Sequence, residues 1–581
     1  MPVNITQRVA DSNDKPHVRI VSLEFENGLS LKMKPHETIV VVGPNNAGKS
    51  LLLREVQGLL QQGPLRQQTH LLRDVHLETD SGVNEVLQWA ISSTPAHLRA
   101  IGPAHDRPVV LPSQRLSDQA VTSLWGTGVS GNGFGVLTPL FCGYLNTEGR
   151  LALAQNVNSF NPVDDSPSHP MHHLHEDDDI EIRISRLVER AFGQELVVNR
   201  SAGPVIQLHL GKRPAPPEGK DRLSKDFRTA VHSLPQVINQ GDGVKAYVGI
   251  LLQTLVINRE ITLIDEPEAF LHPPQATLLG KSLATELQRP RQLIVATHSS
   301  DFLRGMLDAP DAAVRVLRLR RTAGETVVAE LDAGAVRDVW QDTLLRYSGV
   351  FDGLFHDGVI VCEGDADCRF YSAMMDAVAG DLKRPDLLLV HGAGKSRVPA
   401  IVRALQAIQV PVRAVFDIDV LSEEHTLKAA IAAMGGSWDN YSADWKTVKK
   451  AIESKRPELQ TSDVASQIQE ILSAERETTV SQRSFAEIRK VLQKASAWAE
   501  AKRSGKSFVP RGEQTVAYDR LAANLRSLGI FIVEVGEVEG FCPSIANHGP
   551  AWCVAALQRD LGTDPELEDA RSFARELLQH W

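Results

Sequence analysis

A phosphate-loop pattern placed directly after a buried strand constrains the fold of this chain more than any other feature. The apolar run Thr38–Val42 predicts a fully buried strand. The residues Gly43 to Ser50 then match the pattern G-x-x-x-x-G-K-S. Such a loop joins a strand to a helix whose N-terminal N–H groups hold phosphate. We therefore expect an α/β domain with a parallel sheet, and a helix from Ser50 to about Leu60.

The loop supplies most of a candidate ATP site. Lys49 is expected to neutralise the β- and γ-phosphates, and Ser50 to help hold Mg²⁺. Backbone N–H groups of the loop are expected to surround the phosphates. The predicted ATP-binding residues of this segment are Gly43, Asn45, Asn46, Gly48, Lys49 and Ser50.

Two later strands end in polar residues that suit the same site. The run Ile261–Ile264 is followed by Asp265 and Glu266, and the run Gln292–Ala296 leads to His298. Asp265 is predicted to hold Mg²⁺, Glu266 to polarise the attacking water, and His298 to sense the γ-phosphate. Taken singly, these could be surface acids and a core histidine. Their order after a phosphate loop favours the nucleotide site.

Length and composition limit the protein class. A chain of 581 residues can form two to four domains. The longest nearly apolar stretch, Val244–Ile257, contains Lys245 and Gln253, and it is shorter than the roughly 20 residues of a membrane span. Residues Met1–Arg8 lack the apolar segment of a signal peptide. We expect a cytoplasmic protein with no membrane contact.

Cysteine usage and charge narrow the class further. The five cysteines form no C-x-x-C pair, which argues against a disulfide framework and against a zinc ribbon. A net charge of −10 is not typical of a protein that coats nucleic acid passively. It still allows a local basic face or a metal site to bind phosphate.

Several irregular segments interrupt the α/β pattern. Gly126–Gly135 is interpreted as a mobile surface loop, and the Pro/His/Asp segment Asn161–Asp179 as a solvated linker, with a transition-metal site as its alternative. An insertion at about 160–230 could carry dimer contacts. A second, helical insertion at about 440–510 is rich in Lys, Glu, Ala and Gln. Its lysines, including Lys446, Lys449 and Lys450, are either a solvated face or a DNA-facing patch.

A second set of acids follows strands in the C-terminal part. Glu363 comes after Val359–Cys362, Asp417 and Asp419 come after Arg413–Phe416, and Glu537 and Glu539 come after Ile530–Val533. Gathered negative charge is unfavourable unless cations occupy the site. We therefore expect Mg²⁺ or Mn²⁺ there, in chemistry suited to two-metal phosphodiester cleavage. The alternative is that these acids only cap the helices that follow.

Specific motifs resemble a known family. Asp265–Pro273 resembles the D-E-P-E-x-x-L-H-P signature of the ABC-like ATPases in the OLD (overcoming lysogenization defect) family, and Ala296–Ser299 resembles its switch histidine. Gln240–Lys245 stands where such ATPases carry a signature loop, although Asp242 replaces a small residue. The order of Glu363, then Gly392–Lys395, then Asp417 and Asp419 resembles a Toprim domain.

The resemblance implies fold and site roles. It implies an ABC-type ATPase head with an antiparallel β-layer and a helical insertion in residues 1–345, followed by a parallel-sheet Toprim nuclease domain in residues 353–581. Catalytic roles are implied for Glu266, Glu363, Asp417 and Asp419. Metal ligation is implied for Ser50, Asp265, Glu363, Asp367, Asp417, Asp419, Glu537 and Glu539. The implied catalytic lysine is one of Lys395, Lys502 and Lys506.

The function expected from the sequence is that of an ATP-binding, metal-dependent DNA endonuclease, which uses Mg²⁺ or Mn²⁺ at both sites. Relatives of this type, including the Gabija-type nucleases that this layout resembles, act in anti-phage defence. The expected partners are DNA, further copies of the chain joined through the ATPase heads as a dimer or larger oligomer, and an accessory defence protein. The alternative is a nucleotide-dependent sensor or scaffold that acts through a partner effector. A chromosome-maintenance ATPase is disfavoured because long heptad arms are lacking.

Overall fold

The chain forms two compact units, Met1–Ala333 and Gly334–Trp581. The domain boundary expected between residues 345 and 353 stays a prediction. The structure is a computed structural model that describes residues 5–7, 16–64, 68–92, 94, 108–111, 114–161, 165, 167–257, 259–287, 291–309, 314–322, 325–346, 349–380, 384–455, 461–474, 479–493, 497–579 and 581.

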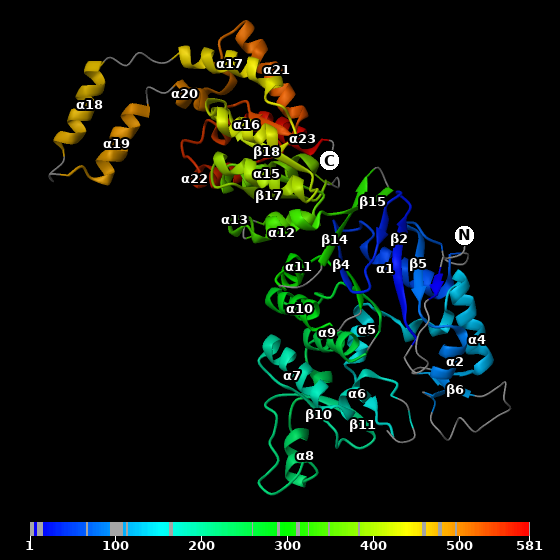
Figure 1. The fold of residues 1–581 in the computed structure, drawn as a ribbon. Helices are drawn as coiled ribbons and strands as arrows, with labels where there is room; N and C mark the ends of the chain where they lie inside the picture. The colour runs from blue at the N-terminus through cyan, green and yellow to red at the C-terminus, as the bar shows by residue number, and fades with distance from the viewer. Residues whose placement is uncertain are drawn as a thin grey trace. The chain divides into compact units, whose positions relative to one another are not determined.

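The first unit is built on a six-stranded sheet (Figure 1). Its strand order is β15-β14-β4-β13-β12-β8, and all neighbours are parallel except the pair β14 and β15. The strands are β4 (Glu37–Val42), β8 (Cys142–Leu145), β12 (Ile261–Asp265), β13 (Gln292–Ala296), β14 (Val314–Thr322) and β15 (Glu325–Glu330). Every residue of β4 is buried, as expected for a central strand of a parallel sheet.

Smaller sheets complete the β structure of this unit. A four-stranded layer has the order β1-β5-β2-β3, a three-stranded sheet has the order β10-β11-β9, and β6 pairs with β7. Their bounds are β1 (Ile5–Gln7), β2 (Val18–Phe25), β3 (Ser30–Lys32), β5 (Leu72–Thr79), β6 (Pro108–Leu111), β7 (Gln114–Ser117), β9 (Val157–Asn158), β10 (Leu196–Asn199) and β11 (Val205–Leu210). The alternating burial of β2 places one face on the core.

Helices surround these sheets. The α-helices are α1 (Lys49–Gln62), α2 (Val83–Ser92), α4 (Asp118–Thr127), α5 (Thr147–Leu153), α6 (Pro170–Glu176), α7 (Asp178–Phe192), α8 (Lys225–His232), α9 (Asp242–Leu251), α10 (Pro273–Glu286) and α11 (Ser300–Leu307). Shorter π and 3₁₀ turns are η1 (Gly128–Asn132), η2 (Gly135–Leu140), η3 (Val237–Asn239) and η4 (Leu252–Val256). The apolar stretch Val244–Ile257 forms most of α9 and η4.

The prediction of a mobile loop at Gly126–Gly135 is wrong. The segment ends α4, forms η1 and begins η2, and Phe134 within it is fully buried. A Cβ on Gly128 would lie 2.2 Å from the Phe134 ring, and one on Gly133 would lie 2.5 Å from the Gln61 carbonyl oxygen. These glycines allow close packing, which the sequence pattern alone does not distinguish from loop flexibility.

The prediction of a solvated linker at Asn161–Asp179 is wrong for its described part. Residues 162–164 and 166 lie outside the described residues. The rest forms α6 and the start of α7, with Met171 and His172 buried. The His172 ring stacks on Phe160 at 4.4 Å between centroids, and its Nε2 lies 3.0 Å from the Asn158 carbonyl oxygen. The prolines and aspartates of this segment favour turns in a sequence-based prediction, although the segment forms a packed helix.

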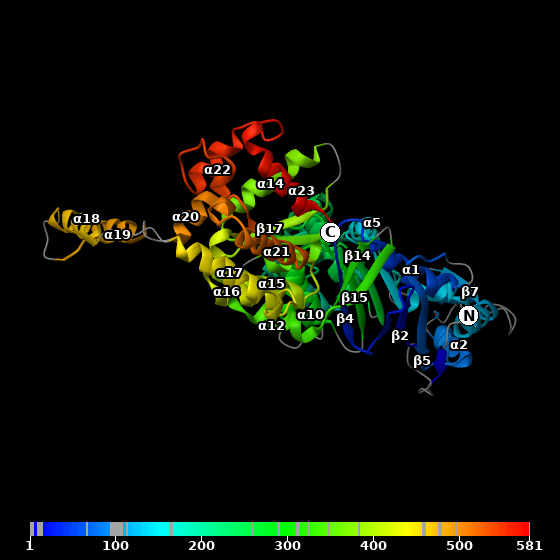
Figure 2. The same ribbon diagram turned by 90° about the horizontal axis from the view of Figure 1, so that it is seen from above.

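The second unit contains a parallel sheet of four strands in the order β17-β16-β18-β19. Figure 2 labels β17 of this sheet among helices of the same unit. The strands are β16 (Gly358–Cys362), β17 (Leu387–His391), β18 (Val412–Asp417) and β19 (Ile530–Val533). Strands of a parallel sheet share one carboxyl edge, where ligands bind. Glu363 follows β16, Asp417 is the last residue of β18, and the loop containing Glu537 follows β19, so all three lie at that edge.

This unit also contains many helices. They are α12 (Ala333–Gln341), α13 (Thr343–Arg346), α14 (Asp365–Ala379), α15 (Val398–Ala407), α16 (Glu424–Ala433), α17 (Asp439–Ser454), α18 (Thr461–Ser473), α19 (Gln482–Gln493), α20 (Ala497–Ser504), α21 (Glu513–Ser527), α22 (Pro550–Leu557) and α23 (Glu568–Leu578). The 3₁₀ turns are η5 (Val350–Phe355), η6 (Lys395–Arg397), η7 (Ile418–Ser422), η8 (Gly505–Phe508), η9 (Val538–Phe541) and η10 (Pro565–Leu567). The mixed α/β class expected from the sequence is confirmed in both units.

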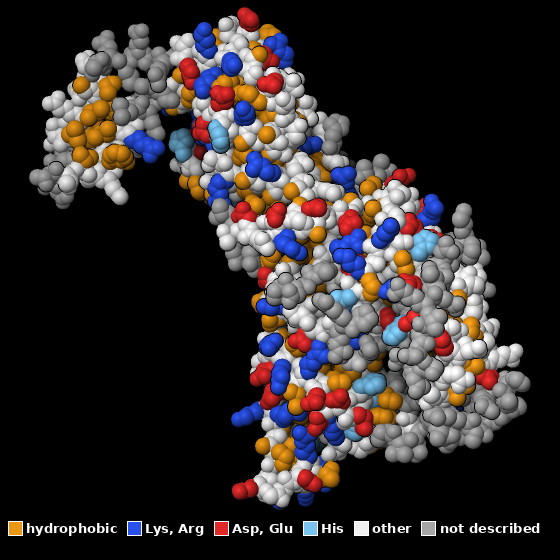
Figure 3. Space-filling view, viewed as in Figure 1, with side chains coloured by type: hydrophobic (Ala, Val, Ile, Leu, Met, Phe, Trp, Pro, Cys, Tyr) orange, Lys and Arg blue, Asp and Glu red, His pale blue; other side chains and the backbone are white. Residues whose placement is uncertain are grey.

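The insertion at about 440–510 is helical in its described residues. Within it, α18 and α19 pack on each other as a hairpin. Figure 3 shows apolar side chains gathered over this hairpin, where Leu472 is 41% and Phe485 is 64% exposed. Among the described residues, no helix is both long and apolar enough to cross a membrane.

Candidate functional site

The phosphate loop has the backbone geometry that its glycines predict. Gly43 has φ +147°, and a Cβ there would lie 2.2 Å from the Leu319 carbonyl oxygen on β14. Gly48 precedes α1 with φ +98°. Both values lie in the region that side chains other than glycine avoid. The loop therefore fits its narrow space between β4 and α1 only with these residues.

Lys49 closes over its own loop. Its side chain is buried, and its Nζ donates to the carbonyl oxygens of Gly43 at 2.7 Å and Pro44 at 2.8 Å. Burial lowers the pKa of Lys49 to about 8, against the raising effect of the nearby acids Glu266, Glu268 and Asp265. A bound phosphate would supply the negative partner that this buried ammonium lacks.

The predicted magnesium and switch residues lie beside the loop. Ser50 Oγ donates to Asp265 Oδ1 at 2.9 Å, and His298 Nε2 lies 3.1 Å from Glu266 Oε1. Burial raises the pKa of Asp265 and lowers that of His298. A pocket of about 810 Å³ adjoins them. Its lining includes the predicted residues Asn46, Gly48, Lys49, Ser50 and His298, whereas Asn45 is an exposed residue of the loop.

Two residues near this pocket were missed by the sequence interpretation. Arg150 on α5 is fully buried, and its Nη1 donates to the carbonyl oxygens of Asp265 at 3.2 Å and Glu266 at 2.6 Å. Glu266 has φ +49°, a conformation that is rare for this residue type. Glu268 accepts a hydrogen bond from the His298 backbone N–H at 2.6 Å. Glu268 belongs to the motif already noted, but no local pattern marks Arg150.

Helix α9 begins inside the segment Gln240–Lys245, which the resemblance places at the signature loop. The helix starts at Asp242, and Lys245 Nζ pairs with Asp242 Oδ1 at 2.8 Å. A Cβ on Gly243 would lie 2.6 Å from the carbonyl oxygen of Phe270, which itself has φ +72°. The start of α9 therefore packs against the turn that follows Glu266.

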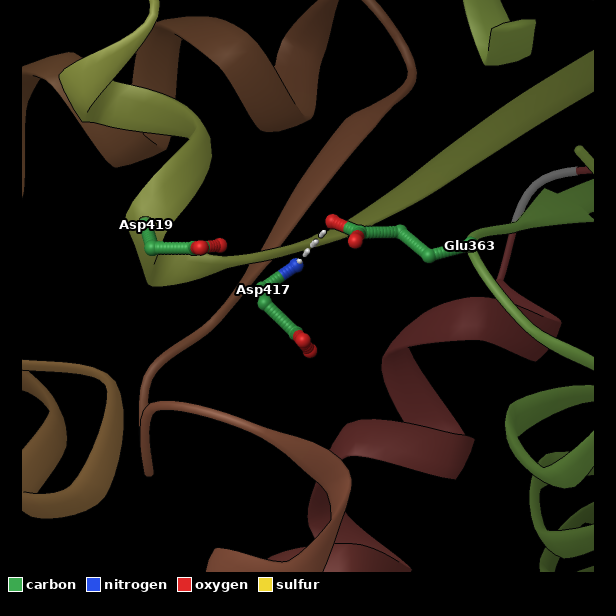
Figure 4. Close-up of side chains that lie close together, drawn as sticks. All are labelled: Glu363, Asp417 and Asp419. Carbon is green, nitrogen blue, oxygen red and sulfur yellow. Dashed lines mark hydrogen bonds between the residues drawn. The ribbon is translucent and has the colours of Figure 1, made fainter. Parts of the chain in front are cut away.

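Three predicted acids converge at the carboxyl edge of the second sheet (Figure 4). Glu363, Asp417 and Asp419 each offer an oxygen, and these three atoms lie within 4.8 Å of one another. The Asp417 backbone N–H donates to Glu363 Oε1 at 3.0 Å. Ile418 between the two aspartates is fully buried, so its neighbours can both face the cluster.

The other predicted ligands surround this cluster without joining it. Asp367 Oδ2 accepts from the Gly364 N–H at 2.7 Å, and Glu539 Oε1 accepts from the Gly549 N–H at 2.7 Å. Glu363 lies on the loop before α14, which begins at Asp365 and carries Asp367 in its first turn. Burial and the charge of Asp417 raise the pKa of Asp367 to about 6. Burial and Glu539 raise that of Glu537.

The three candidate lysines differ in position. Lys502 Nζ lies 2.8 Å from Asp417 Oδ2 and 3.5 Å from Glu537 Oε2, and Lys395 Nζ lies 2.7 Å from Asp419 Oδ2. Lys506 instead pairs with Asp519 at 2.6 Å. Burial opposes the charge of Lys502, but the surrounding acids raise its pKa above the usual value.

Glycine contacts fix the backbone at Lys502. Gly536 has φ +108°, and a Cβ there would lie 2.0 Å from the Lys502 carbonyl oxygen. Gly505 has φ +62°, and a Cβ there would lie 2.3 Å from the Glu534 carbonyl oxygen. The end of α20 is therefore held directly against the loop that follows β19.

The cluster has the chemistry of a divalent-cation site. Oxygen donors are the ligands that Mg²⁺ and Mn²⁺ prefer. Asp419 Oδ1 is buried and accepts no hydrogen bond from the described residues. Burial and the charge of Asp417 raise the pKa of Glu363 to about 8. A cation would satisfy the orphaned oxygen and relieve this repulsion, so the residues fit the expected metal.

We expect the carboxylate cluster to make stability fall with rising pH when no metal is bound. Glu363 keeps its proton in the folded state up to about pH 8, whereas the unfolded chain loses it near 4.5. The free energy of unfolding therefore decreases between these values. In EDTA, the melting temperature of wild type should fall more steeply over this window than that of Glu363→Gln. If the melting temperature fell equally steeply with pH in both proteins, the raised pKa of Glu363 would not be the cause.

Comparisons with known proteins identify both parts of the chain. Residues 152–304 match the family model "AAA domain, putative AbiEii toxin, Type IV TA system". Residues 354–419 match the model "Overcoming lysogenization defect protein-like, TOPRIM domain". The Old nuclease of Escherichia phage P2 is 24% identical over 169 residues. That match spans 28% of this chain and 28% of the phage protein.

Solved structures that resemble this chain include heads of SMC proteins. The SmcHead bound to the C-winged helix domain of ScpA is 14% identical, covers 55% of this chain and 99% of its own, and has a TM-score of 0.32. The SMC head domain from Thermotoga maritima is 10% identical with the same coverage and a TM-score of 0.26. From the family models, the chain carries an AAA-type ATPase domain followed by an OLD-like TOPRIM domain, which is the ATPase–Toprim layout of the OLD family.

Proposed function

We propose that this protein is an ATP-binding, metal-dependent DNA endonuclease whose Toprim site hydrolyses phosphodiester bonds under the control of its ATPase domain. The observation that carries the proposal is the convergence of Glu363, Asp417 and Asp419 within 4.8 Å, at the sheet edge where parallel folds bind ligands. A scaffold that acts only by binding has no need for three partly buried carboxylates in one place.

In the ATPase domain, the loop N–H groups and Lys49 bind the phosphates, and Ser50 and Asp265 hold Mg²⁺. Glu266 accepts a proton from the attacking water. His298 holds the Glu266 side chain and also contacts the γ-phosphate. Their mutual distances of 2.9 Å and 3.1 Å support these roles. Two heads would join around bound ATP, and the start of α9 from one head would face the nucleotide site of the other.

In the Toprim domain, Glu363, Asp417 and Asp419 hold one Mg²⁺ or Mn²⁺, and Asp367, Glu537 and Glu539 complete a second position. The metal would activate water and stabilise the leaving oxygen. Lys502 supplies positive charge beside Asp417 and orients the scissile phosphate. Lys395 forms an ion pair with Asp419 and restrains that side chain. The 2.8 Å and 2.7 Å ion pairs support both assignments.

The proposed partners and setting follow from these activities. The substrate is DNA, and the oligomer is a dimer or larger assembly formed through the ATPase heads. The protein acts in the cytoplasm in defence against phage, with an accessory protein as its trigger. The layout shared with OLD-family proteins supports this setting.

Cleavage of supercoiled plasmid tests the proposal. We expect nicked or linear product with Mg²⁺ or Mn²⁺ and none with EDTA. We also expect the rate to differ with and without ATP, and Lys49→Ala to remove that difference while keeping metal-dependent cleavage. Cleavage that is identical with and without ATP in wild type would refute nucleotide control. No cleavage under any condition would favour the sensor function instead.

A further inference from the structure

Helix α17 carries a lysine-rich face although the whole chain has a net charge of −10. Lys446 and Lys450 are exposed, and they border an open hollow of about 470 Å³ together with Trp445, Lys449, Glu453 and Ser454. Within the described part of the chain, neither Lys446 nor Lys450 has an ion-pair partner. Their charge is therefore available to a ligand.

This face is anchored to the turn that carries Asp419. Trp445 Nε1 donates to the Leu421 carbonyl oxygen at 2.8 Å, and Lys449 Nζ donates to the Ser422 carbonyl oxygen at 3.0 Å. Both acceptors belong to η7, as does Asp419. The Lys449 ammonium also lies 4.9 Å from the Trp445 ring centroid. Trp445 and Lys449 thus fix α17 against η7, the turn that carries Asp419 of the carboxylate cluster.

Phosphates that do not contact the metal ions are repelled by the carboxylates of the cluster. The phosphates that flank the scissile bond therefore need a separate cationic surface. Lys446 and Lys450 lie one helical turn apart, about 6 Å along the axis. That spacing lets the two side chains bind phosphates on the same backbone. Exposed lysines bind phosphate as mobile point charges and without reading sequence.

We propose that Lys446 and Lys450 on α17 bind the DNA backbone that flanks the scissile phosphate. This proposal rests on the proposed nuclease function and names the surface that its substrate occupies. Lys449 positions the helix, and Lys446 and Lys450 contact DNA. Because these contacts are to phosphate, they contribute affinity that depends on salt and is nearly independent of sequence.

The salt dependence of DNA binding tests this assignment. In an Asp417→Asn background, which prevents cleavage, a fluorescent DNA duplex is titrated at several salt concentrations. The double variant Lys446→Gln/Lys450→Gln is expected to reduce the slope of log K against log salt by about 1.8, since each phosphate contact contributes about 0.9. The charge-preserving variant Lys446→Arg/Lys450→Arg should keep the parental slope and exclude a folding defect.

A matched control removes the same charge elsewhere. Lys220→Gln/Lys225→Gln changes two exposed lysines of the first unit and should leave the slope unchanged. A glutamine variant of α17 with the parental slope would overturn the proposed DNA surface alone. Absence of DNA binding by the Asp417→Asn parent would instead overturn the proposed substrate. The two failures are therefore distinguishable.

Discussion

Replacing Asp417 with asparagine is expected to reduce metal-dependent DNA cleavage by more than about 100-fold and to leave ATP hydrolysis unchanged. Loss of a group that merely supports a metal ligand already costs about 10- to 100-fold, so loss of a ligand should cost more. Asp417 lies in the cluster with Glu363 and Asp419 and pairs with Lys502 at 2.8 Å. Plasmid cleavage and phosphate release, measured on one preparation, provide both readouts.

A surface acid of the same sheet provides the control for this variant. Asp386 precedes β17, at the opposite end of the sheet from the cluster, and pairs with His356 at 2.9 Å. Asp386→Asn should cleave at close to the wild-type rate. Asparagine has nearly the same shape as aspartate, and the melting temperature of the variant in EDTA checks that it folds. An Asp417→Asn protein that still cleaves DNA at near the wild-type rate would exclude this cluster as the nuclease site.

Replacing Arg150 with lysine is expected to lower kcat for ATP hydrolysis by about 10- to 100-fold, with little change in ATP affinity. The guanidinium of Arg150 holds the carbonyl oxygens of Asp265 and Glu266. Glu266 keeps its φ of +49° only if the surrounding structure holds it there. A lysine ammonium cannot reproduce the planar, forked donors. Lys49 and the loop bind phosphate without Arg150, so affinity is retained.

Steady-state hydrolysis and titration with a fluorescent ATP analogue separate these effects. Arg291 is a matched control, since it is a buried arginine at the other end of the sheet, where its Nη1 donates to the Thr254 carbonyl oxygen. Arg291→Lys should lower the melting temperature without lowering kcat in the folded fraction. Equal losses of affinity and kcat in Arg150→Lys would show that Arg150 supports the whole pocket rather than the position of Glu266.

The sequence predicts local features of this protein well because they depend on neighbouring residues. The strand before Gly43 is confirmed. Glu363, Asp417 and Asp419 lie close together at one edge of the sheet, because parallel strands share their carboxyl end. Their individual roles stay predictions. The alternation of Asp417 and Asp419 around a buried Ile418 likewise needs only the local pattern.

The features that the sequence did not predict depend on distant residues. Arg150 contacts Glu266 across more than a hundred residues, so no spacing rule marks it. Lys502 and Lys506 are the same residue type in the same segment, so the sequence does not distinguish them. The fold places Lys502 beside Asp417 and Lys506 beside Asp519. The glycines at 126–135 were mistaken for a loop because tight packing and flexibility both favour the residue that lacks a side chain.

The glycine contacts at Lys502 make the position of its ammonium group beside the carboxylate cluster independent of the length of the insertion that precedes it. Gly536 and Gly505 hold the end of α20 against the loop after β19, so the lysine is located by its C-terminal neighbours. Residues can be gained or lost in the α18–α19 hairpin without moving the ammonium group. The Lys502–Asp417 ion pair is therefore expected to tolerate changes in the hairpin, as a rigid scaffold tolerates insertions in its surface loops.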